Sequence, residues 1–160
     1  MARRVFFSFH YERDVSRAAV VRNSNITQEK AGFVDMASWE EVKKGGDDAI
    51  EKWIDRNLDG TSVTAVLLGA ETATRKYVQS EVRKSWNRGN GLLGIKIHNI
   101  KNLQQETDHP GGTEFGFNFK HSDGSTKSFA QSFHIYDWVN DDGYHNLEKW
   151  IESAASQVGR

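Results

Sequence analysis

The sequence predicts an α/β protein with a mainly parallel sheet. Short apolar runs alternate along the chain with stretches in which apolar residues recur at helical spacing, which is the pattern of strands followed by amphipathic helices. The clearest run, residues 63–70, holds a single threonine among apolar residues, as expected of a strand that is buried on both faces. Strands and helices in alternation favour parallel strands joined by helical crossovers.

Five strands are expected. Residues 5–9 are aromatic or β-branched apart from one serine, which favours a central strand. Residues 31–35 form a second, shorter run, and the third strand is expected over residues 61–68, which overlap the clearest run. The fourth and fifth strands are expected over residues 92–97 and 133–138, where apolar side chains again dominate.

Four amphipathic helices are expected between and after these strands. Asp14 is a candidate N-cap for the first helix, and Asp47 or Asp48 for the second, because a short acidic side chain can accept a hydrogen bond from the first-turn backbone. The residues that recur on the apolar faces of the four helices are, in order, Val15, Ala18 and Ala19; Ile50, Trp53, Ile54 and Leu58; Val78, Val82 and Trp86; and Leu147, Trp150, Ile151, Ala154 and Val158.

Two connections are expected to be loops. The segment after residue 35 is polar and ends at the glycine pair Gly45-Gly46, directly before the second helix. Residues 99–116 are polar and glycine-containing and hold the chain's one proline. A loop of this length in a compact domain is often functional or mobile.

A β-hairpin is expected between the fourth and the last strand of the sheet. Phenylalanines alternate over residues 115–119, Asp123-Gly124 follows as a turn, and phenylalanines return at Phe129 and Phe133. The hairpin is either an edge element that covers the core or a lid over a substrate, and the sequence does not decide between the two.

Composition excludes several classes of protein. The chain has 160 residues, the size of a single domain over residues 1–160, and a formal net charge of −1, which gives no indication of binding to nucleic acid or an anionic membrane. It has no cysteine, so thiolate catalysis and cysteine-based metal sites are excluded. The six histidines lack metal-ligand spacing, so no metal site is expected. No apolar run is long enough for a membrane span or a signal peptide, so a soluble protein of the cytoplasm is expected.

Glu81 is the first candidate for chemistry. It stands one helical turn after Tyr77, at the margin of the apolar stripe of the third helix. A carboxylate there is expected to lie half-buried beside the carboxyl ends of the strands, which is where open α/β folds bind ligands. Most glutamates at a helix margin are solvated surface charges, so the assignment depends on the rest of the chain.

Several segments resemble TIR domains. Val-Phe-Phe-Ser-Phe at residues 5–9 resembles the first strand motif of these domains, and residues 33–35 with the later glycine pair resemble the second strand and its loop. Tyr-Val-Gln-Ser-Glu at residues 77–81 resembles the helix motif whose glutamate is catalytic in enzymatic TIR domains. The opening of the chain and Gly-Ile-Lys-Ile-His-Asn at residues 94–99 are most similar to the TIR-like proteins of the bacterial Thoeris anti-phage system.

The resemblance implies a fold, an activity and partners. The fold is a flavodoxin-like three-layer sandwich with a mainly parallel five-stranded sheet. In this family the TIR protein consumes NAD, which is a substrate and not a cofactor, and releases a cyclic or otherwise modified ADP-ribose. This diffusible signal activates a separate effector. The implied partners are NAD, further TIR copies in an assembly, the effector and an unidentified phage trigger, with neither nucleic acid nor membrane.

The resemblance also implies that Glu81 is the catalytic residue. Cleavage of the nicotinamide–ribose bond passes through an oxocarbenium-like transition state, which one carboxylate near the ribose can stabilise. Nicotinamide leaves as a neutral molecule, so no general acid is needed. Core packing is an alternative role for several residues of the first strand. The expected substrate-binding residues are Phe6, Ser8, Phe9, His10, Tyr11, Asp35 and Tyr77.

Two positions depart from the common TIR pattern, and two other functions stay open. His10 stands where many TIR domains carry arginine, so recognition of the NAD phosphates is expected to be weaker or to come from another group. Tyr77 replaces a tryptophan and keeps an aromatic side chain.

One alternative function is a non-catalytic TIR interaction module, which has no need of Glu81. The other is a nucleoside deoxyribosyltransferase-like enzyme, whose additional substrate-fixing acidic residues cannot be placed in this chain.

Overall fold

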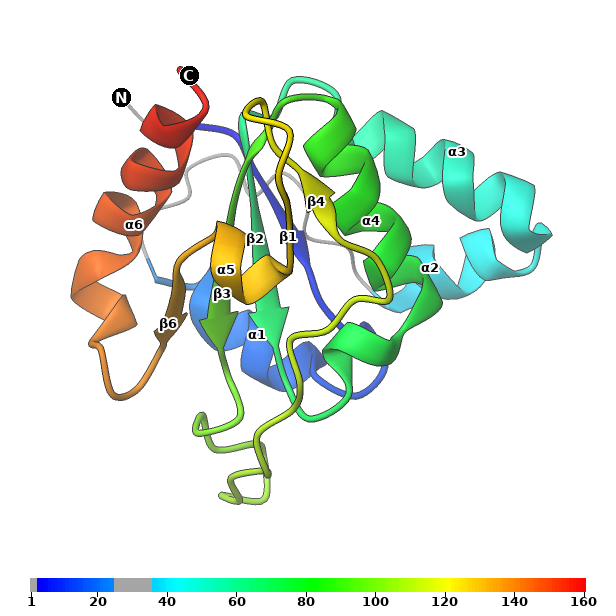
Figure 1. Ribbon diagram of the computed structural model, residues 1–160. Helices are drawn as coiled ribbons and strands as arrows, with labels where there is room; N and C mark the ends of the chain where they lie inside the picture. Colours follow the sequence, from blue (N-terminus) through cyan, green and yellow to red (C-terminus); the bar gives the residue numbers. More distant parts are fainter. Residues whose placement is uncertain (1–2, 25–35) are drawn as a thin grey trace.

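The computed structural model describes residues 3–24 and 36–160 (Figure 1). Within these residues, one sheet is formed by parallel strands in the order β1 (Val5–Ser8), β2 (Val63–Leu68), β3 (Gly91–Lys96) and β6 (Ile135–Asp137). Val5 pairs with Val63, and Val63 pairs with Gly91, so the strands end at a common carboxyl edge. Residues 31–35, expected as a further strand, lie outside the described part of the chain.

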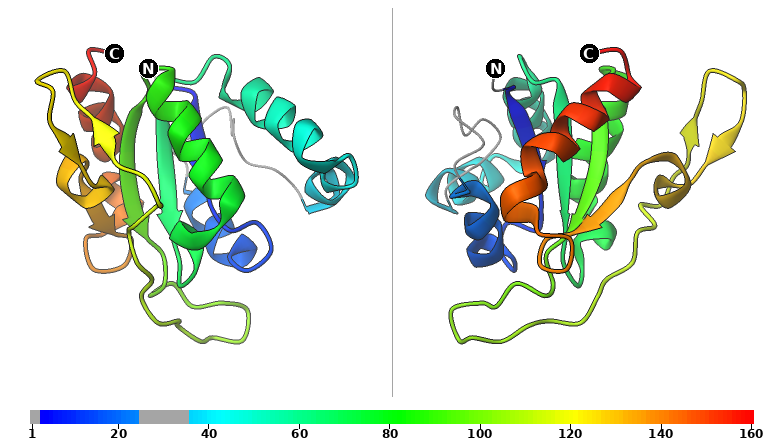
Figure 2. Two further views of the ribbon diagram at one scale, coloured as in Figure 1. Left: turned by 45° about the vertical axis from the view of Figure 1, so that its right-hand side comes forward. Right: turned by 90° about the vertical axis from the view of Figure 1, so that its left-hand side faces the viewer.

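Helices cover both faces of this sheet (Figures 1 and 2). Val63, Ala65 and Leu67 of β2 belong to a core cluster shared with α1, α3 and α6, whereas Val66 and Leu68 belong to a cluster shared with α4 and α5. Successive strand residues point to opposite faces, so the expected α/β class with layered helices is confirmed. The helical elements are α1 (Val15–Arg22), α2 (Met36–Lys43), α3 (Gly46–Leu58), the 3-10 turn η1 (Thr72–Thr74), α4 (Lys76–Asn87), α5 (Phe129–Ser132) and α6 (Gly143–Gln157).

Buried polar side chains fix α4 against the sheet. Thr64 of β2 and Ser85 of α4 share a hydrogen bond of 2.7 Å between their hydroxyls, and Asn90 donates to the same threonine at 3.3 Å. The Ser85 hydroxyl also donates to the backbone carbonyl of Glu81 at 2.7 Å. Satisfied polar groups in a core favour one arrangement over its alternatives, so these contacts set the position of Glu81 relative to β2.

Opposite charges line the contact between α3 and α4, which lie side by side (Figure 2). The acidic side chains of α3 and its C-cap are four residues apart and therefore share one face. These pairs are exposed or partly exposed to solvent, where a single pair contributes about 0–1 kcal/mol. Their main effect is therefore to favour this face of α3 as the one that packs against α4. The N–O pairs are Lys76–Asp47 at 2.8 Å, Lys84–Glu51 at 3.2 Å, Lys84–Asp55 at 2.9 Å and Arg88–Asp59 at 3.0 Å.

Two expectations about the second helix and its approach are wrong. The segment after residue 35 is not a loop up to the glycine pair, because residues 36–43 form α2, and this segment is rich in strong helix formers. Neither Asp47 nor Asp48 caps α3, whose N-cap is Gly45 without a side-chain capping bond. Both aspartates instead lie in the first turn, where negative charge interacts favourably with the helix dipole.

The hairpin is present, but both of its strands are shorter than expected, because residues 115–118 precede the first strand and are not part of it. β4 (Phe119–Lys120) pairs antiparallel with β5 (Thr126–Lys127), and the hairpin extends to one side of the sheet (Figure 2). Phe129 is the first residue of the single turn of α5 and Phe133 is its C-cap, so neither is in a strand; the helical turn begins here because Ser128 and Gln131 form a capping box. Residues four apart share a face in a strand and in a helix alike, so the spacing alone did not distinguish the two.

Candidate active site at the carboxyl edge of the sheet

Glu81 lies in the middle of the buried stripe of α4 and is fully buried. Ser8, the last residue of β1, donates a hydrogen bond from Oγ to Glu81 Oε1 at 2.6 Å. Tyr11, in the turn after β1, donates from its hydroxyl to Oε2. The expected half-buried position is therefore wrong: the buried stripe runs through Val78, Glu81, Val82 and Ser85, and the glutamate belongs to it.

Burial sets the protonation of this site. Desolvation raises the pKa of Glu81 from 4.5 to about 8, and the hydrogen bonds from Ser8 and Tyr11 lower it without offsetting the burial. At neutral pH the carboxyl group is therefore mainly neutral in this arrangement. Burial, followed by the proximity of Glu81, raises the pKa of the Tyr11 hydroxyl well above its usual range, so the phenol keeps its proton.

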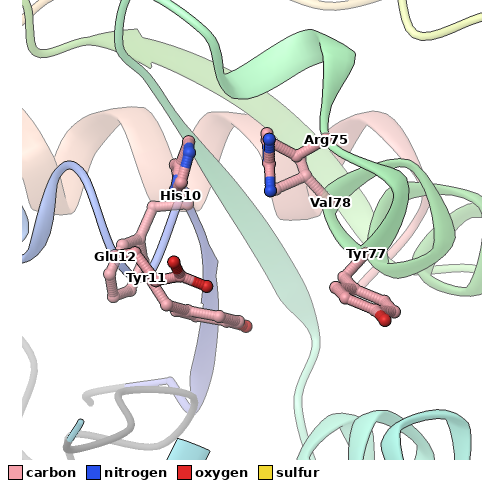
Figure 3. A pocket seen from close by; sticks show the side chains of 7 residues that line it. His10, Tyr11, Glu12, Arg75, Tyr77 and Val78 are labelled. Carbon is pink, nitrogen blue, oxygen red and sulfur yellow. The ribbon is translucent and has the colours of Figure 1, made fainter. Parts of the chain in front are cut away.

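A small pocket lies next to Tyr11 (Figure 3). Its volume is about 30 Å³, which is room for about one or two water molecules and too little to enclose a dinucleotide in this conformation. Glu81 does not line the pocket, although Tyr11 does. The lining residues are Phe9, His10, Tyr11 and Glu12 from the segment directly after β1, and Arg75, Tyr77 and Val78 from the N-cap and first turn of α4.

His10 and Arg75 lie on opposite sides of this pocket (Figure 3). The pKa of His10 is lowered, first by burial and next by the Arg75 cation. The His10 Nδ1 accepts a hydrogen bond from the Arg13 backbone N–H at 3.3 Å, which leaves Nε2 as the donor of the neutral ring. In the sequence, Arg75 belongs to a basic stretch with Lys76, Arg83 and Lys84, which usually indicates a solvated helix face and only less often a contact to dinucleotide phosphates. The fold distinguishes Arg75 from the others by bringing it opposite His10.

The other expected substrate-binding residues occupy different places. Phe6 is fully buried in the core and does not line the pocket. Ser8 contacts Glu81 behind the pocket, whereas Phe9 and Tyr77 both line it. The Tyr77 hydroxyl also donates to Asp47 at 3.2 Å. Asp35 lies outside the described residues.

Arginines of the turn after β1 and of α1 hold the long loop of residues 99–116 at this edge. Arg13 Nη2 donates to Asp108 at 2.8 Å, and Arg17 donates to the carbonyls of Ile100 at 2.7 Å and Glu106 at 3.0 Å. A side chain at Gly111 would clash with the backbone of residues 69 and 70, directly after β2. The loop therefore crosses the carboxyl edge next to the pocket, and it borders a second, polar hollow of about 320 Å³.

Asp14 is a buried carboxyl group with an unusual environment. It occupies the N-cap position of α1, but its side chain makes no capping bond, and neither oxygen has a hydrogen-bond partner among the described residues. Arg17, which is buried on the same helix while Val15 is exposed, lies 3.7 Å from it. Desolvation raises the pKa of Asp14 to about 6, and Arg17 and Arg13 only partly oppose this.

Replacing Asp14 with asparagine should raise stability at neutral pH. The folded protein favours the protonated acid, so ionisation destabilises it as the pH rises from about 4 to above about 6, by on the order of 2–3 kcal/mol. The measurement is the free energy of unfolding of Asp14→Asn and of the wild type, from denaturant unfolding at about pH 5 and about pH 7.5. The stability of the variant relative to the wild type should increase with pH. Asp48→Asn, at an exposed position, is the control. A variant that is equally destabilised at both pH values would show that Asp14 acts as the ionic partner of Arg17.

No group of three or more His, Asp or Glu side chains is placed to hold a metal ion in residues 3–24 and 36–160. Among the helices of those residues, none combines the length and the apolar character that crossing a membrane requires.

Two comparisons with known proteins bear on this edge of the sheet. The family model described as "Thoeris protein ThsB, TIR-like domain" matches residues 6–102, which include β1 from Phe6 onward, Tyr11 and the whole of α4. A protein of Bacillus cereus (strain MSX-D12), named "Putative cyclic ADP-D-ribose synthase ThsB1", is 32% identical over 191 aligned positions that cover 94% of this chain and 100% of the relative. Both confirm the resemblance carried by the strand and helix motifs. The chain belongs to the Thoeris ThsB family of TIR-like domain proteins.

Proposed function

We propose that this protein is an anti-phage TIR enzyme that cleaves NAD at the nicotinamide–ribose bond and makes a cyclic or modified ADP-ribose signal for a separate effector. The observation that carries the proposal is the Glu81 carboxyl group, held in the protein interior by Ser8 and Tyr11 next to the pocket. Burying a carboxyl group is costly, and a protein that served only as a docking module would have no use for it. The name of the Bacillus cereus relative supports NAD as the substrate and a cyclic product.

Glu81 acts electrostatically in this mechanism. As the nicotinamide departs, positive charge develops on the ribose, and a carboxylate directly beneath the ring stabilises that charge more in the transition state than in the ground state. The Ser8 hydroxyl, bonded to Oε1 at 2.6 Å, fixes the orientation of the carboxyl group from the side of β1. The reaction needs no cofactor, because NAD itself supplies the leaving group.

Arg75 and His10 are the groups that we assign to the dinucleotide. Arg75 is exposed at the rim of the pocket, and a guanidinium group there suits the diphosphate. It supplies the positive charge that His10, a neutral ring at the position of the common TIR arginine, does not. The His10 Nε2–H can donate to a ribose hydroxyl or to a phosphate oxygen. Phe9 and Tyr77 provide aromatic surface on the same pocket.

The direct test is incubation of the purified protein with NAD, with and without lysate from phage-infected cells, followed by mass spectrometry of the nucleotides. A modified or cyclised ADP-ribose that depends on the intact protein supports the proposal. NAD that stays intact under every condition, together with binding to other TIR proteins, would favour the non-catalytic module. The proposal places this chemistry in the cytoplasm, in an assembly of several copies that forms in response to an unidentified phage component.

Substitution of His10 or Arg75 with alanine should raise the KM for NAD. A hydrogen bond to a charged group contributes about 1.5–3 kcal/mol, so Arg75→Ala should raise KM by about tenfold or more. The KM for NAD from steady-state kinetics and the melting temperature of each variant, both compared with the wild type, check this. Arg83→Ala is the matched control, because that guanidinium stands over the Phe117 ring at 4.4 Å, outside the pocket lining. A large fall in the melting temperature of His10→Ala with unchanged kinetics would instead make His10 a core residue.

A further inference from the structure

The proposed catalytic carboxyl group cannot meet a substrate in the arrangement described above. Glu81 is fully buried and both of its oxygens are hydrogen-bonded. The neighbouring pocket has a volume of about 30 Å³ and does not include Glu81 in its lining. Some group must therefore move before a ribose can reach this carboxyl group.

Tyr11 stands between the pocket and Glu81. Its side chain lines the pocket, and its hydroxyl is bonded to Glu81 Oε2. The ring is held edge-to-face by Phe9, with ring centres 4.7 Å apart, and by Trp53 of α3, with ring centres 5.9 Å apart. Ser8 also bonds the carboxyl group, but it lies outside the pocket lining. Displacement of Tyr11 would open a path from the pocket, whereas loss of the Ser8 hydroxyl would not.

The burial to which the Tyr11 side chain contributes also affects the charge of Glu81. A neutral carboxyl group gives little stabilisation to a developing cation, so the reaction needs the carboxylate. Desolvation is the main reason that the pKa of Glu81 is raised, and admitting water or a polar substrate weakens that cause. Departure of the Tyr11 ring removes one hydrogen bond that favours the carboxylate, but water or a substrate hydroxyl that enters can donate in its place. Because desolvation is the larger effect, the net result is an exposed carboxyl group in a more favoured ionised form.

We infer that Tyr11 is a positioning residue that caps Glu81 in the resting protein, and that Glu81 becomes competent when the Tyr11 side chain leaves the carboxyl group. The inference rests on the proposed function for its biological meaning, but the cap itself is a structural property. Because Trp53 of α3 contacts the Tyr11 ring, a shift of α3 on assembly is a physical route by which the cap can be released.

The cap can be tested without NAD by chemical labelling of carboxyl groups. Carbodiimide with glycine ethyl ester modifies accessible carboxyl groups, and peptide mass spectrometry locates them. In the wild type, Glu81 should stay unmodified while the exposed Glu114 is labelled as an internal standard. Tyr11→Ala should label Glu81 severalfold more, and Tyr11→Phe, which keeps the ring but loses the hydroxyl, should lie between the two. Ser8→Ala, the matched control, should stay at the wild-type level.

Activity gives a second and separate readout. Without a phage trigger, Tyr11→Ala should cleave NAD faster than the wild type, and adding Glu81→Gln to that variant should remove the gain. Protection of Glu81 in both Tyr11 variants, or equal labelling of Tyr11→Phe and Ser8→Ala, overturns the cap. Labelling as expected, with no NAD cleaved by any variant under any condition, leaves the cap in place and refutes the proposed enzyme. If the triggered wild type cleaves NAD but Glu81 stays protected in the Tyr11 variants, the proposed enzyme stands and the cap is refuted.

Discussion

Glu81→Gln is expected to abolish NAD cleavage and, at the same time, to make the folded protein more stable above neutral pH. The amide keeps the volume of the side chain and can still bond Ser8 and Tyr11, but it carries no charge. Removing one preorganised electrostatic partner commonly lowers the rate by about 10²–10³. Mass-spectrometric quantification of nucleotides at matched protein concentration measures the loss. Turnover close to that of the wild type would remove Glu81 from the catalytic role.

The stability effect follows from the raised pKa of Glu81. The folded state holds the Glu81 proton up to about pH 8, whereas the ordinary pKa of this group is 4.5. Ionisation therefore destabilises the folded state as the pH rises from about 4.5 to about 8. Glutamine cannot ionise, and its advantage should grow to the order of a few kcal/mol by about pH 8.5 while staying small at about pH 5. Thermal unfolding at the two pH values measures it, with the exposed Glu114→Gln as the control. Equal destabilisation of Glu81→Gln at both values would indicate that the wild type holds a carboxylate there.

Shortening the loop of residues 99–116 is expected to shift the products from modified ADP-ribose to free ADP-ribose. A signal-producing enzyme must let a nucleophile other than water attack the ribosyl cation, which requires a site closed to solvent. The loop crosses the carboxyl edge and is tied there by Arg13 and Arg17. Replacing residues 102–112 with a short Gly-Ser link removes the contacts of Asp108 and of the Glu106 carbonyl, so water should enter more readily.

Two further variants make the loop experiment specific. Gly111→Ala leaves the loop at full length but forces it away from the backbone after β2, because the added Cβ would clash with the Gly69 carbonyl, and it should shift the products in the same direction. Shortening the exposed hairpin turn at residues 122–124 is the control and should leave the product ratio unchanged. Chromatography of the products gives the ratio. If free ADP-ribose already dominates for the wild type, the protein is a plain NAD glycohydrolase and not a signalling enzyme.

Local patterns predicted most of the fold correctly. The apolar runs of β1, β2 and β3 and the faces of α3, α4 and α6 were found because burial imposes periods of two and 3.6 residues on the sequence. The return arm of the hairpin failed because two structures satisfied the same pattern, whereas the full burial of Glu81 depends on elements distant in the sequence. Phe129 and Phe133 fit a strand or a helix equally, and the capping box at Ser128 decided for the helix.

The sequence by itself determined the family, the layered α/β class and Glu81 as the residue to examine, because these depend on local motifs and periodicity. Only the tertiary structure decided that Glu81 is buried and capped by Tyr11, that Arg75 faces His10, and that Arg17 anchors a loop that follows it by more than eighty positions. These contacts join segments far apart in the chain. Burial, and with it the pKa of a carboxyl group, depends on every element packed around the residue and not on its neighbours in sequence.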